Sequence, residues 1–167
     1  MISIHRQHIR HGLHALLALA VLALAALLAF QPDPRDAMRR ADALFIAGHY
    51  HDALTAYYAL AARAPDSAPA RLRLGMVLVV RGEQPAASRE LGWALRLGLN
   101  DADAALARLY QGRMAADLGY HDEAARSWAQ IAPDSPYYGP RLALEAEERL
   151  RGGDYTNAEA GYRAALA

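Results

Sequence analysis

One short motif occurs four times along this 167-residue chain. An alanine follows its glycine after five residues, a large apolar residue follows after nine, and another apolar residue follows after twelve. Such spacing places apolar side chains on one helical face, so it predicts a helix, a tight turn at the glycine and a second helix. The motif returns every 34 to 37 residues, which predicts a solenoid of stacked helix pairs around a continuous core. The four copies read GHYHDA from Gly48, GEQPAA from Gly82, GYHDEA from Gly119 and GDYTNA from Gly153.

The repeat resembles the tetratricopeptide repeat (TPR), whose pattern has Leu-Gly in the first helix, glycine at the turn, and then alanine, an aromatic residue, alanine and proline. The fourth copy departs from this pattern, because Glu145 and Arg149 stand where leucine and tyrosine are usual. The resemblance covers about residues 34 to 167 and implies an all-α solenoid of about four helix pairs, with repeats at about 34–67, 68–101, 105–138 and 139–167. The second copy matches best, through Leu74, Gly75, Leu78, Gly82, Ala87, Leu91 and Ala94.

Three features interrupt the regular repeat. Three extra residues around Asn100–Asp103 are expected to lengthen the junction between the second and third repeats. The tyrosine pair 137–138 lies between two prolines, where it would either stiffen the last junction or form an interface. No polar capping helix follows the fourth repeat, so we expect an apolar face around Tyr162 and Leu166 that a partner or a second copy could cover.

A long apolar segment precedes the repeats. Residues 13–30 are eighteen in number and are interrupted only by His14. As a helix they would extend about 27 Å, enough for a bilayer core of roughly 30 Å. We therefore predict a transmembrane anchor at 13–30, a polar tail at 1–12 and a linker at 31–33. A cleaved signal peptide is the alternative: residues 23–25 read Ala-Leu-Ala, although cleavage there would leave apolar residues at the new terminus.

The charges on either side of the apolar segment bear on the orientation of the predicted anchor in the membrane. Arg6 and Arg10 precede the apolar segment, and three further arginines follow it closely. Basic residues alone leave the orientation undecided, but a short basic tail before a first span usually stays inside the cell. We expect a single-pass inner-membrane protein with a cytoplasmic N-terminus and periplasmic repeats. Histidines at every third position from His5 to His14 drift around a helix, which favours a polar flank over a metal ladder.

The composition excludes several function classes. Eighteen basic residues balance eighteen acidic ones, so the electrostatic attraction that nucleic-acid binding depends on is missing. The absence of cysteine excludes disulfides, thiolate zinc sites, a cysteine nucleophile and a lipidated cysteine. No phosphate-binding glycine loop, GxSxG or HExxH motif occurs. We predict no catalytic residue, cofactor or metal; an enzymatic alternative would depend on His51 or Glu147.

The TPR resemblance also implies a partner-binding groove, formed by three positions on the first helix of each repeat. Its predicted lining is largely apolar, which suits an amphipathic helix or an extended apolar segment. Of the positions that bind acidic tails in chaperone-binding TPR proteins, only Arg113 fits, so such tails are disfavoured. Alternatively, the groove is closed by the chain's own linker or by a neighbour. The predicted groove residues are Met38, Asp42, Phe45, Leu72, Met76, Val79, Leu109, Arg113, Glu147 and Leu150, with Ala116 and Ala143 between them.

These features together predict a non-enzymatic, membrane-anchored bacterial scaffold. It is similar to small anchored TPR accessory proteins, which implies a role in the assembly or maturation of periplasmic or membrane complexes. The expected partners are envelope or membrane proteins, bound through the groove or the C-terminal face, with the bilayer binding residues 13–30. The alternative is a permanent structural subunit of a larger membrane complex.

Overall fold

The computed structural model describes residues 17–22 and 33–166. The chain divides into two units, residues 1–36 and 37–167. In the first unit, residues 17–22 are helical and exposed, while the rest of the predicted anchor at 13–30 lies outside the described residues. Within the described ranges, no helix combines the length and the apolar character needed to cross a membrane.

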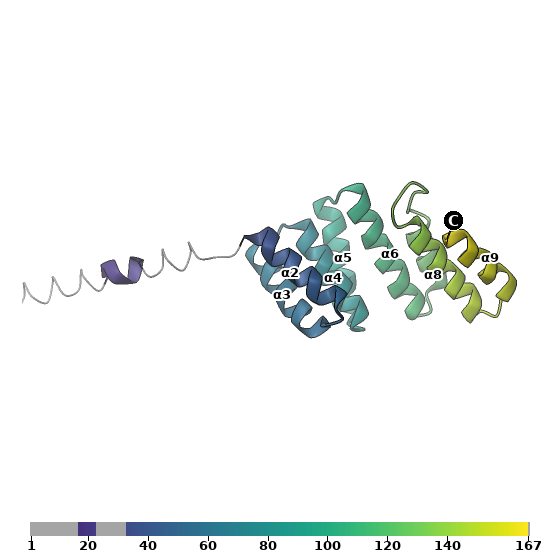
Figure 1. The fold of residues 1–167 in the computed structure, drawn as a ribbon, viewed down its shortest axis with the longest axis horizontal. Helices are drawn as coiled ribbons and strands as arrows, with labels where there is room; N and C mark the ends of the chain where they lie inside the picture. The colour runs from purple at the N-terminus through teal and green to yellow at the C-terminus, as the bar shows by residue number, and fades with distance from the viewer. Residues whose placement is uncertain (1–16, 23–32, 167) are drawn as a thin grey trace, which may run out of the picture. The chain divides into compact units, whose positions relative to one another are not determined.

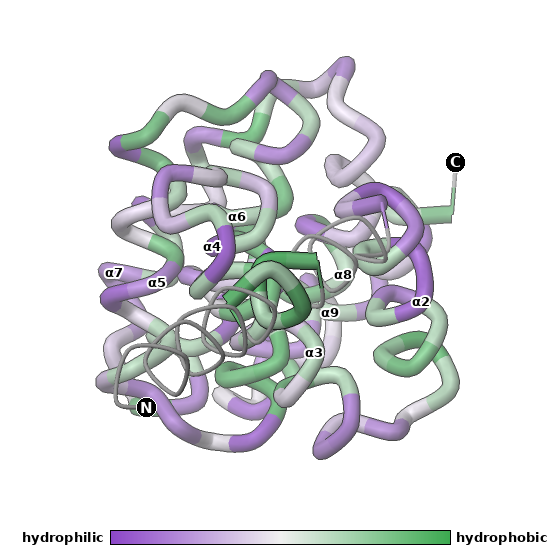
Figure 2. Tube along the Cα trace, turned by 90° about the vertical axis from the view of Figure 1, so that its left-hand side faces the viewer, coloured by the Kyte–Doolittle hydropathy of each residue, from purple (hydrophilic) through white to green (hydrophobic). Residues whose placement is uncertain are grey.

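Between residues 33 and 166 the chain forms eight helices in sequential pairs, which confirms the predicted all-α architecture of stacked helix pairs (Figure 1). The pairs are α2 (Pro34–Ile46) with α3 (Tyr50–Arg63), α4 (Ala68–Val80) with α5 (Gln84–Leu97), α6 (Asp101–Asp117) with α7 (His121–Trp128), and α8 (Tyr138–Arg151) with α9 (Tyr155–Ala165). Helices α4 and α6 each contact at least three other helices. Hydrophobic and hydrophilic residues alternate along the helices (Figure 2).

The motif glycines make the turn inside each pair. Gly48, Gly82, Gly119 and Gly153 have φ angles of 80, 75, 79 and 83°, a left-handed conformation that glycine adopts without steric cost. After each glycine, the next backbone N–H donates to a carbonyl five residues earlier; in the first pair, His49 N donates to Leu44 O at 2.9 Å. This bond satisfies a carbonyl that the helix end would otherwise leave unpaired.

The prediction of a longer junction between the second and third pairs is wrong. The extra residues extend α6, which has 17 residues, whereas α4 has 13. Asn100 caps α6, because its side chain accepts a hydrogen bond from Asp103 N at 2.9 Å. A capping asparagine and two aspartates in the first turn favour a helix start at this point.

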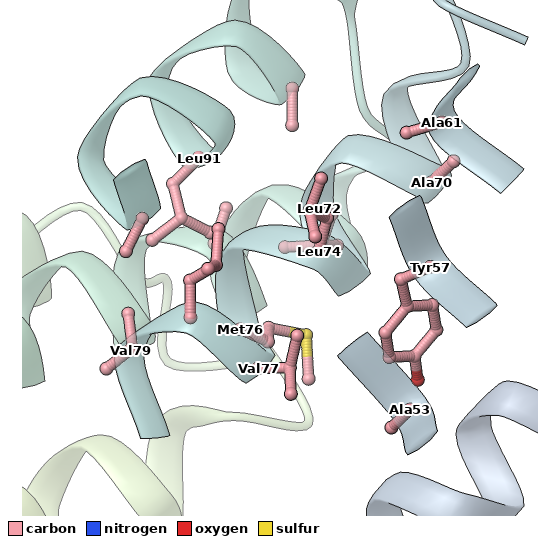
Figure 3. Close-up of a cluster of buried hydrophobic side chains, with 14 of the residues drawn as sticks. Ala53, Tyr57, Ala61, Ala70, Leu72, Leu74, Met76, Val77, Val79 and Leu91 are labelled. Atoms are coloured by element: carbon pink, nitrogen blue, oxygen red, sulfur yellow. The ribbon is translucent and has the colours of Figure 1, made fainter. Parts of the chain in front are cut away.

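Two apolar clusters form the core of residues 37–166. The larger one joins α2 to α6 and centres on α4, where nine residues are buried. Tyr57 and Leu91 lie on opposite sides of the α4 residues of this cluster (Figure 3). The smaller cluster lies around Trp128 and Ile131. Tyr137 packs partly buried against both clusters, while Tyr138 begins α8, so the first tyrosine is part of the last junction rather than a free interface.

Fewer residues are buried in α8 and α9 than in the preceding helix pairs. Only Ala146 of α8 is buried, and only Ala158 and Gly161 of α9 are. The side chains buried in the described ranges are all hydrophobic. The first three helix pairs are therefore held together by apolar packing to a greater extent than the fourth.

Candidate partner-binding surfaces

The groove predicted from the sequence does not extend along all four repeats. Leu72, Met76 and Val79 are buried core residues, with Met76 only 7% exposed. The reason is that α3, α5 and α6 all pack on α4 and cover these positions. The expectation of an exposed Met76 is therefore wrong. Half-buried residues of the same core include two more predicted groove residues of α2, Met38 and Phe45.

Asp42, another predicted groove residue, connects several helices. Its Oδ1 accepts a hydrogen bond from the Tyr57 hydroxyl at 2.7 Å and pairs with Arg73 Nε at 3.3 Å. Arg73 also forms an ion pair with Asp103 of α6, with 3.6 Å between Nη1 and Oδ1. Burial raises the pKa of Tyr57, and the hydrogen bond to Asp42 raises it further. The phenol therefore remains a neutral donor, and Asp42 acts as a structural link between α2, α3 and α4.

The link between Asp42 and Tyr57 is not predicted from the sequence. The repeat pattern places Tyr57 on the apolar face of its helix, and the TPR resemblance places Asp42 on a binding surface. The signal in the sequence that could have indicated this hydrogen bond is that Asp42 and Tyr57 lie on the two helices of one hairpin, 15 residues apart. A buried tyrosine needs a partner for its hydroxyl, so an acidic residue on the opposite helix is a natural candidate.

Four predicted groove residues do converge. Leu109, Arg113, Ala143 and Glu147 line a cleft of about 320 Å³ that we call the α6–α8 cleft. Leu150 is 43% exposed and does not line it. The floor is mainly apolar, and the Arg113 and Glu147 side chains contribute opposite charges. The remaining lining residues are Tyr110, Pro140, Leu144 and Tyr162.

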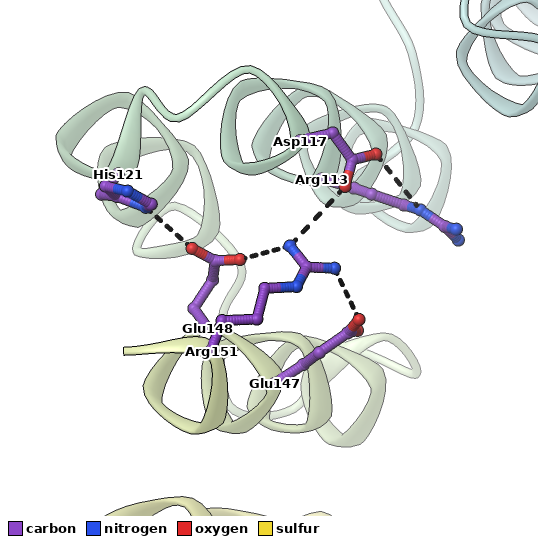
Figure 4. Close-up of polar contacts among 6 residues, drawn as sticks. All are labelled: Arg113, Asp117, His121, Glu147, Glu148 and Arg151. Atoms are coloured by element: carbon purple, nitrogen blue, oxygen red, sulfur yellow. Dashed lines mark hydrogen bonds and ion pairs between the residues drawn. The ribbon is translucent and has the colours of Figure 1, made fainter. Parts of the chain in front are cut away.

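A network of charged residues joins α8 to α6 and α7 (Figure 4). We call it the polar seam; its residues are Arg113, Asp117, His121, Glu147, Glu148 and Arg151. Arg151 is central to it, with both Glu147 and Glu148 at 2.6 Å and Asp117 at 3.7 Å. Glu148 also contacts His121 Nδ1 at 2.8 Å. A second cavity of about 640 Å³ borders this network. The sixth residue of the seam is Arg113, which pairs with Asp117 at 3.9 Å.

Glu145 and Arg149, which depart from the TPR pattern, lie beside the same cavity. Arg141 Nε binds Glu145 at 2.8 Å, and Nη1 of Arg141 donates to Ile131 O at 3.1 Å. Polar contacts thus replace part of the apolar packing between the third and fourth helix pairs. The departure is visible in the sequence, but the partners of these side chains depend on the tertiary arrangement.

Among the described residues, no group of three or more histidine, aspartate or glutamate side chains could hold a metal ion. His49 and His51 are both exposed. The absence of a metal, a cofactor and catalytic residues stays a prediction.

Comparison with solved structures identifies the architecture. A thermophilic TPR protein of Thermus thermophilus superposes with a TM-score of 0.67 at 26% identity, covering 94% of this chain and 87% of that protein. The chain is TPR-like and all-helical. MamA superposes with a TM-score of 0.63 at 20% identity, over 85% of this TPR-like chain and 81% of MamA. No protein-family model and no curated protein matches the sequence. TPR proteins are typically non-enzymatic scaffolds, so the TPR-like fold implies protein partners.

Proposed function

We propose that this chain is a membrane-anchored TPR scaffold of the bacterial cell envelope that assists the assembly or maturation of a periplasmic or membrane complex. The α6–α8 cleft carries the binding part of this proposal, since Leu109, Arg113 and Glu147 converge there. The apolar segment at 13–30 supports the anchor, and the cytoplasmic tail and periplasmic repeats follow from the sequence argument given above.

The chemistry of the cleft fits an apolar side chain of a protein segment. Leu109 and Leu144 offer apolar surface, and Tyr110 adds a large ring. Aromatic and apolar pockets with a charged rim are the usual anchor points of protein interfaces. Arg113 and Glu147 would then fix the orientation of the bound segment through its polar groups.

The binding proposal is tested by filling the cleft. We would substitute Ala143→Arg, because Ala143 lines the cleft and an arginine four residues before Glu147 would have a helical ion-pair partner. The matched control is Ala62→Arg on the exposed surface of α3. Crosslinking pull-down of the full chain from native membranes should recover a partner with the control, and about tenfold less with Ala143→Arg if the cleft supplies about 1.4 kcal/mol or more of binding.

Recovery of no protein partner by the unaltered chain would contradict the scaffold, and equal recovery by both variants would move binding away from the cleft. Topology is tested separately with a reporter that works only in the periplasm, fused after Ala167. It should be active, and the mature N-terminus should be Met1 or Ile2. An N-terminus near Ala26 or Gln31 would contradict the anchor.

A further inference from the structure

One face of α6, bordered by α5 and α7, is only partly covered: Ala115 is buried, and Gln111 and Met114 are half-buried. Gln111, Met114, Ala115 and Leu118 follow the i, i+3, i+4, i+7 spacing of a packing stripe. They form the floor of a groove of about 820 Å³ whose edges come from α5 and α7. Leu118 is 46% exposed. We call this the outer groove; it shares no lining residue with the α6–α8 cleft.

Exposed apolar residues also lie along α9. Tyr155 and Leu166 are 70% and 89% exposed, and Tyr162 between them is 37% exposed and also lines the α6–α8 cleft. Their spacing of i, i+7 and i+11 places them along one side of the helix. Ala158 and Gly161, about 60° and 120° around the helix from Tyr155, face α8. This exposed apolar stripe on α9 has the character of a packing surface rather than of a solvated one.

The α9 helix is long enough to cover the outer groove. The α9 helix has 11 residues and so extends about 16 Å. The α7 edge of the outer groove is the eight-residue helix His121–Trp128, about 12 Å long, with Tyr120 and Gln130 just beyond its ends. A helix of the size of α9 would therefore cover the floor from Gln111 to Leu118.

The charges also match when α9 runs antiparallel to α7. Glu123 and Arg126 border the outer groove and form no ion pair within the described residues. On α9, Glu159 and Arg163 flank the apolar stripe, paired with each other at 2.6 Å and largely exposed. In the antiparallel orientation Arg163 would face Glu123, and Glu159 would face Arg126.

The same orientation aligns the apolar residues. Since α6 runs antiparallel to α7 within its pair, the docked α9 would run parallel to α6. Leu166 would then lie at the Leu118 end of the floor, and Tyr162 would lie near Met114. One docking orientation thus satisfies the charged edge and the apolar floor together.

The chain's own α9 cannot fill its own outer groove without leaving α8. Gly161 packs so closely on α8 that an added Cβ would come within 2.9 Å of the Ala146 Cβ. From these observations we infer that the outer groove binds the α9 helix of a second copy of this chain. This self-association goes beyond the partner binding proposed for the α6–α8 cleft.

Disulfide trapping tests the contact, because the chain has no cysteine of its own. Two differently tagged full-length chains, one with Leu118→Cys and the other with Leu166→Cys, would be co-expressed and oxidised in their membranes. We expect about tenfold more mixed-tag crosslink than with Leu118→Cys and Thr55→Cys on exposed α3, since a disulfide needs Cα atoms within about 7 Å. Equal yields for the two pairs, or crosslinking of Leu166→Cys to a different protein only, would overturn the inference.

A charge exchange tests the orientation. Glu123→Arg in the Leu118→Cys chain should lower the crosslink about fivefold, because two arginines would then face each other. Arg163→Glu in the Leu166→Cys chain should restore it. Failure of the second change to restore the crosslink, with unchanged helix content by circular dichroism, would overturn the antiparallel docking.

Discussion

Gly112 of α6 lies directly against the indole ring of Trp128 of α7. The same indole donates a hydrogen bond from Nε1 to the carbonyl oxygen of Leu109 at 3.2 Å. A Cβ on Gly112 would overlap the ring, so the absence of a side chain sets the spacing of this helix pair. Gly75 has the same relation to Leu91 in the preceding pair, where an added Cβ would lie 2.7 Å from the leucine side chain.

We therefore expect Gly112→Ala to destabilise the domain. The overlap with Trp128 should cost about 1–3 kcal/mol, which exceeds the roughly 1 kcal/mol that alanine gains over glycine in a helix. Urea unfolding would measure the difference. Gly92→Ala on α5 is the matched control, because its Cβ would meet only the flexible end of Arg96. The control should be neutral or stabilising, and an equal loss in both variants would contradict the packing argument.

Met76→Ala and Leu150→Ala should differ strongly, although the sequence placed both residues in one groove. Met76 is buried and Leu150 is 43% exposed. Truncating the buried side chain should cost about 2–4 kcal/mol, whereas the exposed one should cost well under 1 kcal/mol. Thermal and urea unfolding of the two variants would measure this. Similar small losses would mean that Met76 is accessible after all.

These contrasts indicate how far the fold can be predicted from the sequence. The helix pairs follow from local signals, because the turn glycines Gly48 to Gly153 and the residues after them act within a few positions. The burial of Met76 depends on three helices packed around α4, which no local pattern encodes. The link between Asp42 and Tyr57 likewise depends on how two helices face each other. Spacing within a repeat predicts the helices and the turns, whereas it does not predict which side chains contact each other between helices.

Tyr57 should make stability depend on alkaline pH. Burial and Asp42 raise its pKa, so the native state keeps the proton while the unfolded tyrosine ionises near pH 10. The unfolded state thus binds fewer protons, and stability should fall as pH rises above about 10 with no change from this group below that. Urea unfolding between pH 8 and pH 11 would follow the loss.

In Tyr57→Phe this part of the alkaline loss should disappear, while stability at neutral pH should fall by about 1–2 kcal/mol for the lost hydrogen bond to a carboxylate. Tyr110, whose pKa is also raised by burial, would still contribute alkaline loss in both proteins. Tyr58→Phe on the exposed side of α3 is the control. An alkaline slope in Tyr57→Phe equal to that of the unaltered chain would contradict the assignment.

Arg151→Ala should loosen the fourth helix pair without unfolding the first three. Exposed ion pairs contribute little individually, so we expect local opening of α8 and α9 to become easier by about 1 kcal/mol. Amide hydrogen exchange should accelerate in α8 and α9 and remain unchanged in α4. High salt should reproduce part of this effect in the unaltered chain, because it screens the same pairs. Arg163→Ala, outside the polar seam, should leave the exchange of α8 unchanged.

The polar seam has a consequence for how such a chain changes over evolutionary time. Where repeats meet through tight apolar packing, as where α3 packs on α4, a new neighbour must match the shape of the old one. Ion pairs centred on Arg151 are less demanding, because long charged side chains adjust their reach. Duplication, loss or exchange of a repeat is therefore tolerated best after α7, and chimeras recombined there should fold more often than chimeras recombined after α3 or α5.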